Sequence, residues 1–210
     1  MLKLKSFTVN PFQQNTYLIW NSQNEAAIID PGNSNNTENQ AIKNFIEANN
    51  LTLKRLLLTH AHIDHVMGNK FIFDEYKLLP EMHVADLFFI EKMTDTAHMY
   101  GVNCEQSPNP TAYINDNDII TLGELTIKCI HTPGHSPGSI SFYFEKERVL
   151  ISGDVLFYGS IGRTDLPMGN HETLISSIKN KLFHLGDDVK VYSGHGPATS
   201  IGFEKASNPF

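Results

Sequence analysis

The stretch Thr59-His60-Ala61-His62-Ile63-Asp64-His65 places three imidazoles and one carboxylate within six residues. It follows the apolar run Leu56-Leu57-Leu58, so we expect a buried strand to end where this polar turn begins. Burying several ionisable groups together is costly unless something binds them, and neutral imidazole and carboxylate are ordinary metal ligands. A solvated surface loop is the alternative for a single histidine, but the pattern His-x-His-x-Asp-His predicts a metal site.

Strands and helices are expected to alternate on both sides of this turn. The residue patterns before it predict strands over 2–9, 16–20, 26–29 and 54–59 and an amphipathic helix over 38–49. The patterns after it predict helices over 64–70, 85–100 and 171–185 and strands over 78–84, 119–121, 125–130, 139–144, 148–152 and 189–193. This order is typical of a layered α/β fold, and no linker or shift in composition predicts a domain break within residues 1–210.

The overall composition argues against several classes of protein. Of the 210 residues, 40% are hydrophobic and 19% are charged, which is ordinary for a globular protein. The formal net charge of −7 argues against a nucleic-acid partner, and no apolar segment approaches the ~20 residues that a membrane helix needs. The first residues predict no export signal, so we expect a cytoplasmic protein in which Cys104 and Cys129 are reduced thiols.

Single polar residues follow three further predicted strands and are flanked by glycine. These residues are His135, Asp154 and His195. Strand ends open onto the ligand crevice in layered α/β folds, and glycine beside a ligand lets the backbone approach closely or take a positive φ. Each residue alone could belong to an ordinary turn, but together they supply ligands that complement the histidine turn. His131 competes with His135 in the same loop, and we expect it to face solvent or to support a ligand.

These residues together, in the order His60-Ala61-His62-Ile63-Asp64-His65, His135, Asp154 and His195, resemble the metallo-β-lactamase superfamily. Within it the chain is similar to the short variants of the glyoxalase II (hydroxyacylglutathione hydrolase) branch. The resemblance implies a four-layer αββα sandwich formed by residues 1–210, without the C-terminal helical extension that holds glutathione in full-length glyoxalase II. It also implies that Asp154 bridges two metal ions, one held by His60, His62 and His135 and the other by Asp64, His65 and His195.

The chemistry implied by this resemblance is hydrolysis of a thioester, such as an S-acyl-glutathione or a related acyl-thiol. Three imidazoles around a metal with an open position form the arrangement that activates a water at neutral pH. We expect two divalent metal ions, zinc in the first place, with iron and manganese as alternatives. Asp64 and Asp154 are the candidate catalytic carboxylates, and Asp64 orients the nucleophile while serving as a ligand. A monomer or a small homo-oligomer is expected.

Recognition of the substrate is expected from the segment that follows Asp154. Tyr158 and Arg163 are the candidate substrate-binding residues, because a guanidinium binds a carboxylate through two hydrogen bonds. The alternative for Arg163 is an ion pair with Asp165 or Glu172. Thr164-Asp165 stands where full-length glyoxalase II enzymes carry an aromatic pair, which argues against glutathione specificity.

The rival enzyme is a persulfide (sulfur) dioxygenase. Gly162-Arg163-Thr164-Asp165 is similar to the corresponding loop of that family as well. Such an enzyme would hold a single iron through His60, His135 and Asp154, following the facial arrangement of two histidines and one carboxylate. A metal-stabilised binding module without turnover is a third class, but structural zinc sites are usually rich in cysteine, and neither cysteine here is a candidate ligand.

Overall fold

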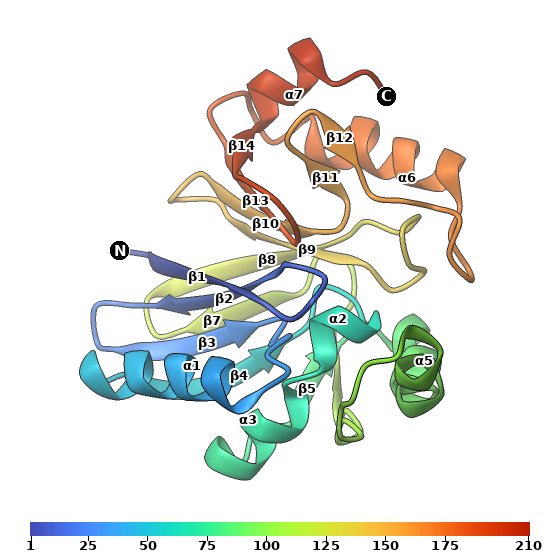
Figure 1. Cartoon of the computed structure of the whole chain (residues 1–210). Helices are drawn as coiled ribbons and strands as arrows, with labels where there is room; N and C mark the ends of the chain where they lie inside the picture. The colour runs from blue at the N-terminus through green and yellow to red at the C-terminus, as the bar shows by residue number, and fades with distance from the viewer.

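The computed structural model describes residues 1–210 and contains two six-stranded sheets that pack face to face, with helices on both outer faces (Figure 1). The first sheet has the order β1-β2-β3-β4-β5-β6. Its strands are Lys3–Val9, Gln14–Trp20, Glu25–Ile29, Thr52–Leu57, Pro80–Met82 and Ala112–Tyr113. β1, β2 and β3 form the predicted antiparallel meander, whereas β3, β4, β5 and β6 pair in parallel.

The second sheet has the order β14-β13-β10-β9-β8-β7. In chain order from β7 to β10, followed by β13 and β14, its strands are Ile119–Leu122, Leu125–His131, Ile140–Phe144, Val149–Gly153, Lys190–Ser193 and Thr199–Ser200. Its pairs are antiparallel except for β10 and β13, which run in parallel. A short hairpin of β11 (Leu156–Phe157) and β12 (Ser160–Ile161) lies outside both sheets.

Alternation along the strands creates the layers. In β3 the side chains of Ala26 and Ile28 join an outer core, whereas those of Ala27 and Ile29 join the core between the two sheets. The outer core of the first sheet includes apolar residues of α1 (Asn36–Ala48), α3 (Asn69–Tyr76), α4 (Leu87–Glu91) and α5 (Met93–Tyr100). The outer core of the second sheet includes those of α6 (His171–Ser177) and α7 (Ile201–Ser207). The predicted αββα sandwich is therefore confirmed.

Three predicted helices are interrupted in the structure. The helix expected over 64–70 divides into α2 (Ile63–Val66) and α3, because the Gly68 amide donates to the carbonyl of Pro31, outside the helix. The helix expected over 85–100 divides into a 3₁₀ turn, Val84–Asp86, followed by α4 and α5. The helix expected over 171–185 stops at Ser177 and continues as a π-helical turn, Ile178–Leu182. None of the helices is both long and apolar enough to traverse a bilayer.

Candidate metal centre

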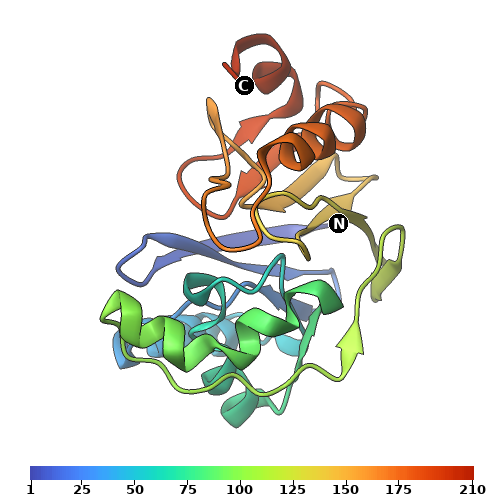
Figure 2. The ribbon, with the colours of Figure 1, turned by 90° about the vertical axis from the view of Figure 1, so that its right-hand side faces the viewer.

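The seven predicted ligand residues come together where strand ends of both sheets meet. His60 and His62 follow β4, and α2, which begins directly after His62, carries Asp64 and His65. The remaining ligands follow β8, β10 and β13 of the second sheet. Figure 2 faces this flank, where the green α4–α5 segment and the orange segment before α6 lie on opposite sides of the turn that carries α2.

His60, His62 and His135 form the first compact group. The Nε2 atom of His135 lies 2.8 Å from Nδ1 of His62 and 3.2 Å from Nε2 of His60. Three imidazole nitrogens in such close contact cannot all satisfy one another through hydrogen bonds, because a neutral ring has one donor and one acceptor. A shared cation satisfies all three, so this donor set fits a metal ion.

Asp64, His65 and His195 form the second group, and Asp154 lies between the two groups. Oδ2 of Asp64 lies 3.0 Å from Nε2 of His195 and 3.6 Å from Nε2 of His65. Oδ1 of Asp154 lies 3.4 Å from Nε2 of His65, and its Oδ2 lies 3.5 Å from Nε2 of both His135 and His195. Asp154 thus contacts both groups, which is the position that a bridging carboxylate requires.

Hydrogen bonds on the outer side of the histidines fix which ring nitrogen faces inward. Nδ1 of His135 donates to the carbonyl of Arg163 at 2.7 Å, and Nδ1 of His195 donates to the carbonyl of Phe12 at 3.1 Å. Nδ1 of His65 lies 2.9 Å from the Asp30 carboxylate. Because these partners accept hydrogen bonds from Nδ1, each ring in its neutral form presents an unprotonated Nε2 to the groups, as metal ligation requires.

Two observations test whether a metal fits between these side chains. Nε2 of His65 and Oδ1 of Asp154 are buried and have no hydrogen-bond partner, although such atoms are costly to leave unpaired. Gly194 leaves the space that these atoms need: a Cβ there would lie 2.0 Å from Oδ1 of Asp154 and 2.7 Å from Cε1 of His65. The residues fit a metal ion in composition, protonation and space.

Burial and neighbouring charges affect the histidine pKa values of the two groups differently. In the first group, burial lowers the pKa of His62 to about 3 and that of His60 well below its usual value, so both rings are neutral. Burial alone would also lower the pKa of His65, but the carboxylates of Asp154, Asp64 and Asp30 outweigh it and raise that pKa well above the usual value. The second group therefore attracts a positive charge, either a proton or a metal ion.

Two buried carboxylates that the sequence analysis missed hold the ligand-bearing turns. Asp30 accepts hydrogen bonds from the amide and the hydroxyl of Thr59, both at 2.6 Å, and contacts His65. Asp86 accepts from the Ala61 amide at 3.0 Å, from the Ser136 hydroxyl and from the Gly138 amide. Asp30 carries part of the signature of His135, Asp154 and His195, since it directly follows the apolar strand β3 and a glycine, Gly32, lies two residues further on. Asp86 lies inside a predicted helix and carries no such signal.

Asp30 also belongs to a third compact group with His60 and His65. Its Oδ2 already accepts hydrogen bonds from Thr59 and His65, and its Oδ1 accepts from the Thr59 backbone. These bonds place Asp30 behind His65, on the side of the ring away from Asp154 and Asp64. Asp30 is therefore placed to orient the candidate ligand His65, and its oxygens are already engaged in hydrogen bonds.

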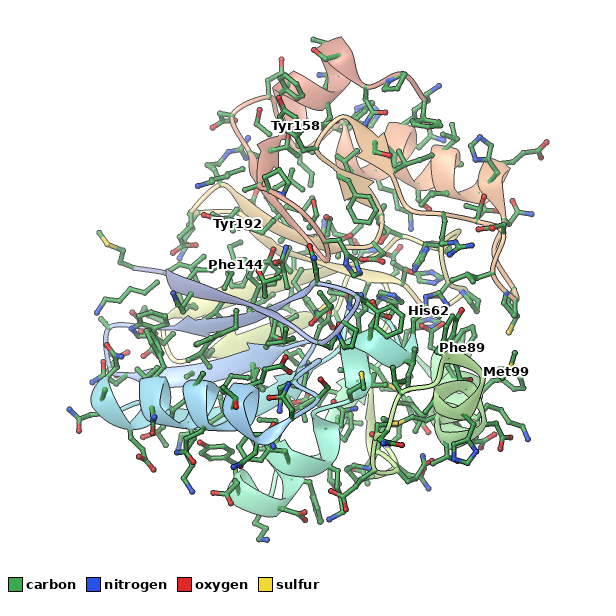
Figure 3. All side chains as sticks on the ribbon, in the orientation of Figure 1. His62, Phe89, Met99, Phe144, Tyr158 and Tyr192 are labelled. Atoms are coloured by element: carbon green, nitrogen blue, oxygen red, sulfur yellow. The ribbon has the colours of Figure 1, made fainter.

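The two predicted substrate-binding residues have different positions. Arg163 lines the cavity next to the metal centre, and its guanidinium makes two hydrogen bonds to Asp165, the ion pair considered as the alternative. Tyr158 does not line that cavity; its ring stacks on Phe203 of α7 with the centroids 4.9 Å apart. Figure 3 shows Tyr158 far from His62. The structure thus places Tyr158 away from the cavity, because α7 packs on the hairpin that carries it, and substrate binding by Tyr158 stays a prediction.

His131 is also placed as expected of a residue outside the ligand set. Its Nε2 lies 2.8 Å from the carbonyl of Pro137, and its ring stacks on His83 with the centroids 4.3 Å apart. It belongs to none of the compact groups of metal-ligating side chains. Of the two histidines of this loop, His135 is the one that lies in a compact group.

This fold, with the ligand residues at its strand ends, defines the class of the protein. The sequence model of the metallo-beta-lactamase superfamily matches residues 9–195, and the chain belongs to this superfamily of metallo-hydrolases. It is 40% identical over 216 residues to hydroxyacylglutathione hydrolase GloC of Haemophilus influenzae. The matched region covers 100% of this chain and 98% of that protein.

Two solved structures have closely similar folds. The structure of BLEG-1 B3 metallo-beta-lactamase gives a TM-score of 0.91 at 38% identity, covering 99% of both chains. The structure of TTHA1623 in a di-iron-bound form gives a TM-score of 0.89 at 32% identity, covering 98% of this chain and 99% of the other. The predicted superfamily is confirmed, and the similarity to the GloC hydrolase agrees with the predicted branch.

Proposed function

We propose that this protein is a dinuclear metallohydrolase that cleaves a thioester, such as an S-acyl-glutathione or a related acyl-thiol. The observation that carries the proposal is the position of Asp154, whose carboxylate contacts histidines of both ligand groups. The similarity to a hydroxyacylglutathione hydrolase supports the substrate class. A thiolate is a good leaving group near neutral pH, so a thioester needs little help from a general acid.

The side chains divide the work of this reaction between them. His60, His62 and His135 would hold one metal ion, Asp64, His65 and His195 the other, and Asp154 both. Bound metal ions supply hydroxide near neutral pH and stabilise the negative charge that develops on an acyl oxygen. The outward hydrogen bonds of His65, His135 and His195 keep each ring in the tautomer that leaves Nε2 free. Asp64 lines the cavity beside the ligands, where it can orient the attacking water.

Metal removal and reconstitution test this function. Release of free thiol from an acyl-glutathione should stop when a chelator removes the metal, and it should return when zinc, iron or manganese is added back. Two metal equivalents per chain at full activity are expected. Thiol release that persists after complete metal removal would refute the proposal.

The rival dioxygenase makes a different prediction for the same protein preparation. It would hold one iron through His60, His135 and Asp154, leaving His65 and His195 without a metal. Elemental analysis of protein purified without added metal, together with oxygen uptake on glutathione persulfide, distinguishes the two. TTHA1623, at 32% identity, is described in a di-iron-bound form, so iron alone does not identify the dioxygenase. One iron per chain together with oxygen uptake would identify the dioxygenase.

A further inference from the structure

A cavity of about 530 Å³ opens onto the metal centre. Its size lies in the range of roughly 300–1,000 Å³ that is usual for small-molecule sites. His62, Asp64, His135, Asp154 and His195 form its polar end, and eleven of its twenty lining residues are hydrophobic. A substrate whose reacting carbon lies at the metals must therefore place another part of itself against an apolar wall.

Aromatic side chains from two separate segments build this wall. Phe89 of α4 lies against His62, with the ring centroids 4.9 Å apart, and Phe88 packs on Phe89. Phe12, from the β1–β2 loop, meets Tyr100 of α5 edge to face, with the centroids 5.8 Å apart. Figure 3 shows Phe89 between His62 and the outlying Met99 of α5. The wall thus begins at a metal-ligand residue and continues outward along α4 and α5.

The outer part of the wall is open to solvent. The exposed fractions are 47% for Phe88, 49% for Tyr100 and 85% for Met99. Single exposed apolar residues are normal, but several gathered at the mouth of a cavity mark a surface that a ligand covers. Burying them against an apolar group releases water from both surfaces, which is favourable in proportion to the apolar area.

The same cavity offers little to an anionic group away from the metals. Arg163 is its one lysine or arginine, and its Nε and one terminal nitrogen each lie 2.7 Å from an Asp165 oxygen. Both oxygens of the Asp165 carboxylate thereby occupy the guanidinium, so a substrate carboxylate would have to displace Asp165. The charge of the wall therefore does not favour the carboxylates of a peptide thiol such as glutathione.

We propose that this wall selects a thioester with an apolar acyl group, bound against Phe12, Phe88, Phe89 and Tyr100. The acyl chain extends from the metal centre along α4 and α5, and it supplies the specificity that the thiol carrier does not. This substrate class rests on the proposed thioesterase function. The proposed apolar acyl group differs from a hydroxyacyl group, because the hydroxyl of the latter would find few hydrogen-bond partners along the wall.

A series of thioesters tests the proposal with the metal-loaded protein. The series has acetyl, butanoyl, hexanoyl and lactoyl groups, each on glutathione and on the small neutral thiol N-acetylcysteamine. We expect kcat/KM to rise about two- to fourfold with each added methylene, because each one is removed from water on binding. We expect the same rise on both thiols and a lower value for lactoyl than for butanoyl. A flat series, or a preference for lactoyl, would overturn the proposal.

Variants of the wall locate the effect. Phe88→Ala and Tyr100→Ala should each lower the ratio of hexanoyl to acetyl kcat/KM about five- to tenfold, because less apolar surface remains for the longer chain. Tyr113→Ala is the matched control, since Tyr113 is 43% exposed on β6 and does not line the cavity. The ratio should not change in this control. An unchanged ratio in both wall variants would contradict the assignment.

Asp165→Asn tests the charge argument separately. Removing the carboxylate frees the Arg163 guanidinium, so kcat/KM for glutathione thioesters should rise relative to N-acetylcysteamine thioesters with the same acyl group. If the ratio does not rise, Arg163 is not the group that limits binding of an anionic carrier, and this part of the inference is wrong.

A binding measurement separates failure of this inference from failure of the proposed function. Hexyl and ethyl thioethers of N-acetylcysteamine cannot be hydrolysed, and calorimetry on the metal-loaded protein gives their affinities. If no thioester is cleaved but the hexyl compound binds more tightly in the wild type than in Phe88→Ala, the apolar site stands and the proposed reaction fails. If thioesters are cleaved and the two thioethers bind equally, the reaction stands and the apolar site fails.

Discussion

The Asp30 carboxylate fixes the orientation of His65, one of the candidate metal ligands. Asp30 is fully buried, and its carboxylate accepts two hydrogen bonds from Thr59 and one from Nδ1 of His65. It takes a left-handed backbone conformation with φ of 51°, which is uncommon for a residue other than glycine. The side chain of Asp30 both holds the turn after β4, through Thr59, and sets the tautomer of the candidate ligand His65.

Asp30→Ala should weaken the second metal site. The change leaves the buried Thr59 amide without an acceptor, at a cost of about 1–3 kcal/mol in the free energy of unfolding, and it frees the His65 ring. Loss of such a supporting partner typically lowers metal affinity about 10- to 100-fold. Competition with a chromophoric chelator measures the affinity, and urea unfolding measures the stability.

Asp74→Ala is the control for this change, because Asp74 lies exposed on α3 and its carboxylate pairs with Lys70 at the surface. It should leave both metal affinities as they are in the wild type. Unchanged metal affinities in Asp30→Ala would show that His65 keeps its orientation without this carboxylate.

Two loops each contribute both to the orientation of a candidate metal ligand and to the cavity wall. The β1–β2 loop supplies the Phe12 carbonyl to His195 and the Phe12 ring to the cavity wall. The segment before α6 supplies the Arg163 carbonyl to His135 and the Arg163 side chain to the same cavity. A small molecule that contacts either side chain therefore touches a residue whose backbone orients a candidate metal ligand, His135 or His195.

The loop after β13 has a steric requirement that a single methyl group tests. Gly194→Ala would place a Cβ 2.0 Å from Oδ1 of Asp154, and we expect it to displace that carboxylate. Metal content should fall from two equivalents toward one, with activity falling at least about tenfold. Elemental analysis and thiol release measure the two effects.

Gly196→Ala is the matched control in the same loop. Gly196 has φ of +73°, and nothing lies within 4 Å of the position that an added methyl group would take. Its substitution therefore strains the backbone without touching a ligand. It should lower stability but retain the metal content of the wild type. Equal loss of metal in both variants would mean that backbone strain, not contact with Asp154, disturbs the site.

On the scale of the whole molecule, the metal centre depends on how the two sheets dock. β2 of the first sheet holds the loop that carries His195: the Asn15 amide donates to the Gly194 carbonyl, and the Asn15 side chain donates to the carbonyls of Ser193 and Gly196. The Tyr17 hydroxyl also donates to the Ser193 carbonyl, at 2.6 Å. These bonds join segments more than 170 residues apart, so the second ligand group assembles only when both sheets are in place.

The Tyr17 hydroxyl makes the contact between the two sheets, and with it the free energy of unfolding, sensitive to alkaline pH. Burial raises the pKa of Tyr17 well above its usual value of about 10, so the folded protein keeps a proton that the unfolded chain releases. The contribution of Tyr17 is therefore fully present below about pH 10. Above that pH, the free energy of unfolding should fall by up to about 1.4 kcal/mol per pH unit.

Urea unfolding at pH 8 and pH 11 measures this effect. Tyr17→Phe should be less stable than the wild type at pH 8, by about 1 kcal/mol for the lost hydrogen bond, yet lose less stability between the two pH values. Tyr113→Phe, at an exposed position, should follow the wild type at both. Equal losses in Tyr17→Phe and the wild type would assign the alkaline effect to other groups.

Much of the architecture could be predicted from local pattern. Apolar runs ending in glycine and a polar residue located the strand ends, because alternation and turn residues are properties of a few adjacent positions. The same signature indicated His135, Asp154 and His195, and Asp30 shows part of it, a polar residue directly after an apolar strand. The breaks in the helices were not predictable in this way, since the one at Gly68 depends on the distant carbonyl of Pro31.

The sequence by itself determined the fold class, the superfamily and the seven candidate ligand residues, because these depend on residue type, spacing and order along the chain. Only the tertiary structure decided how those residues are arranged around Asp154, that Arg163 pairs with Asp165, and that Tyr158 packs on Phe203. It also brought Phe12 and Tyr100 together as one wall. These contacts join segments far apart in the chain or depend on side-chain direction, and the packing of the layers fixes both.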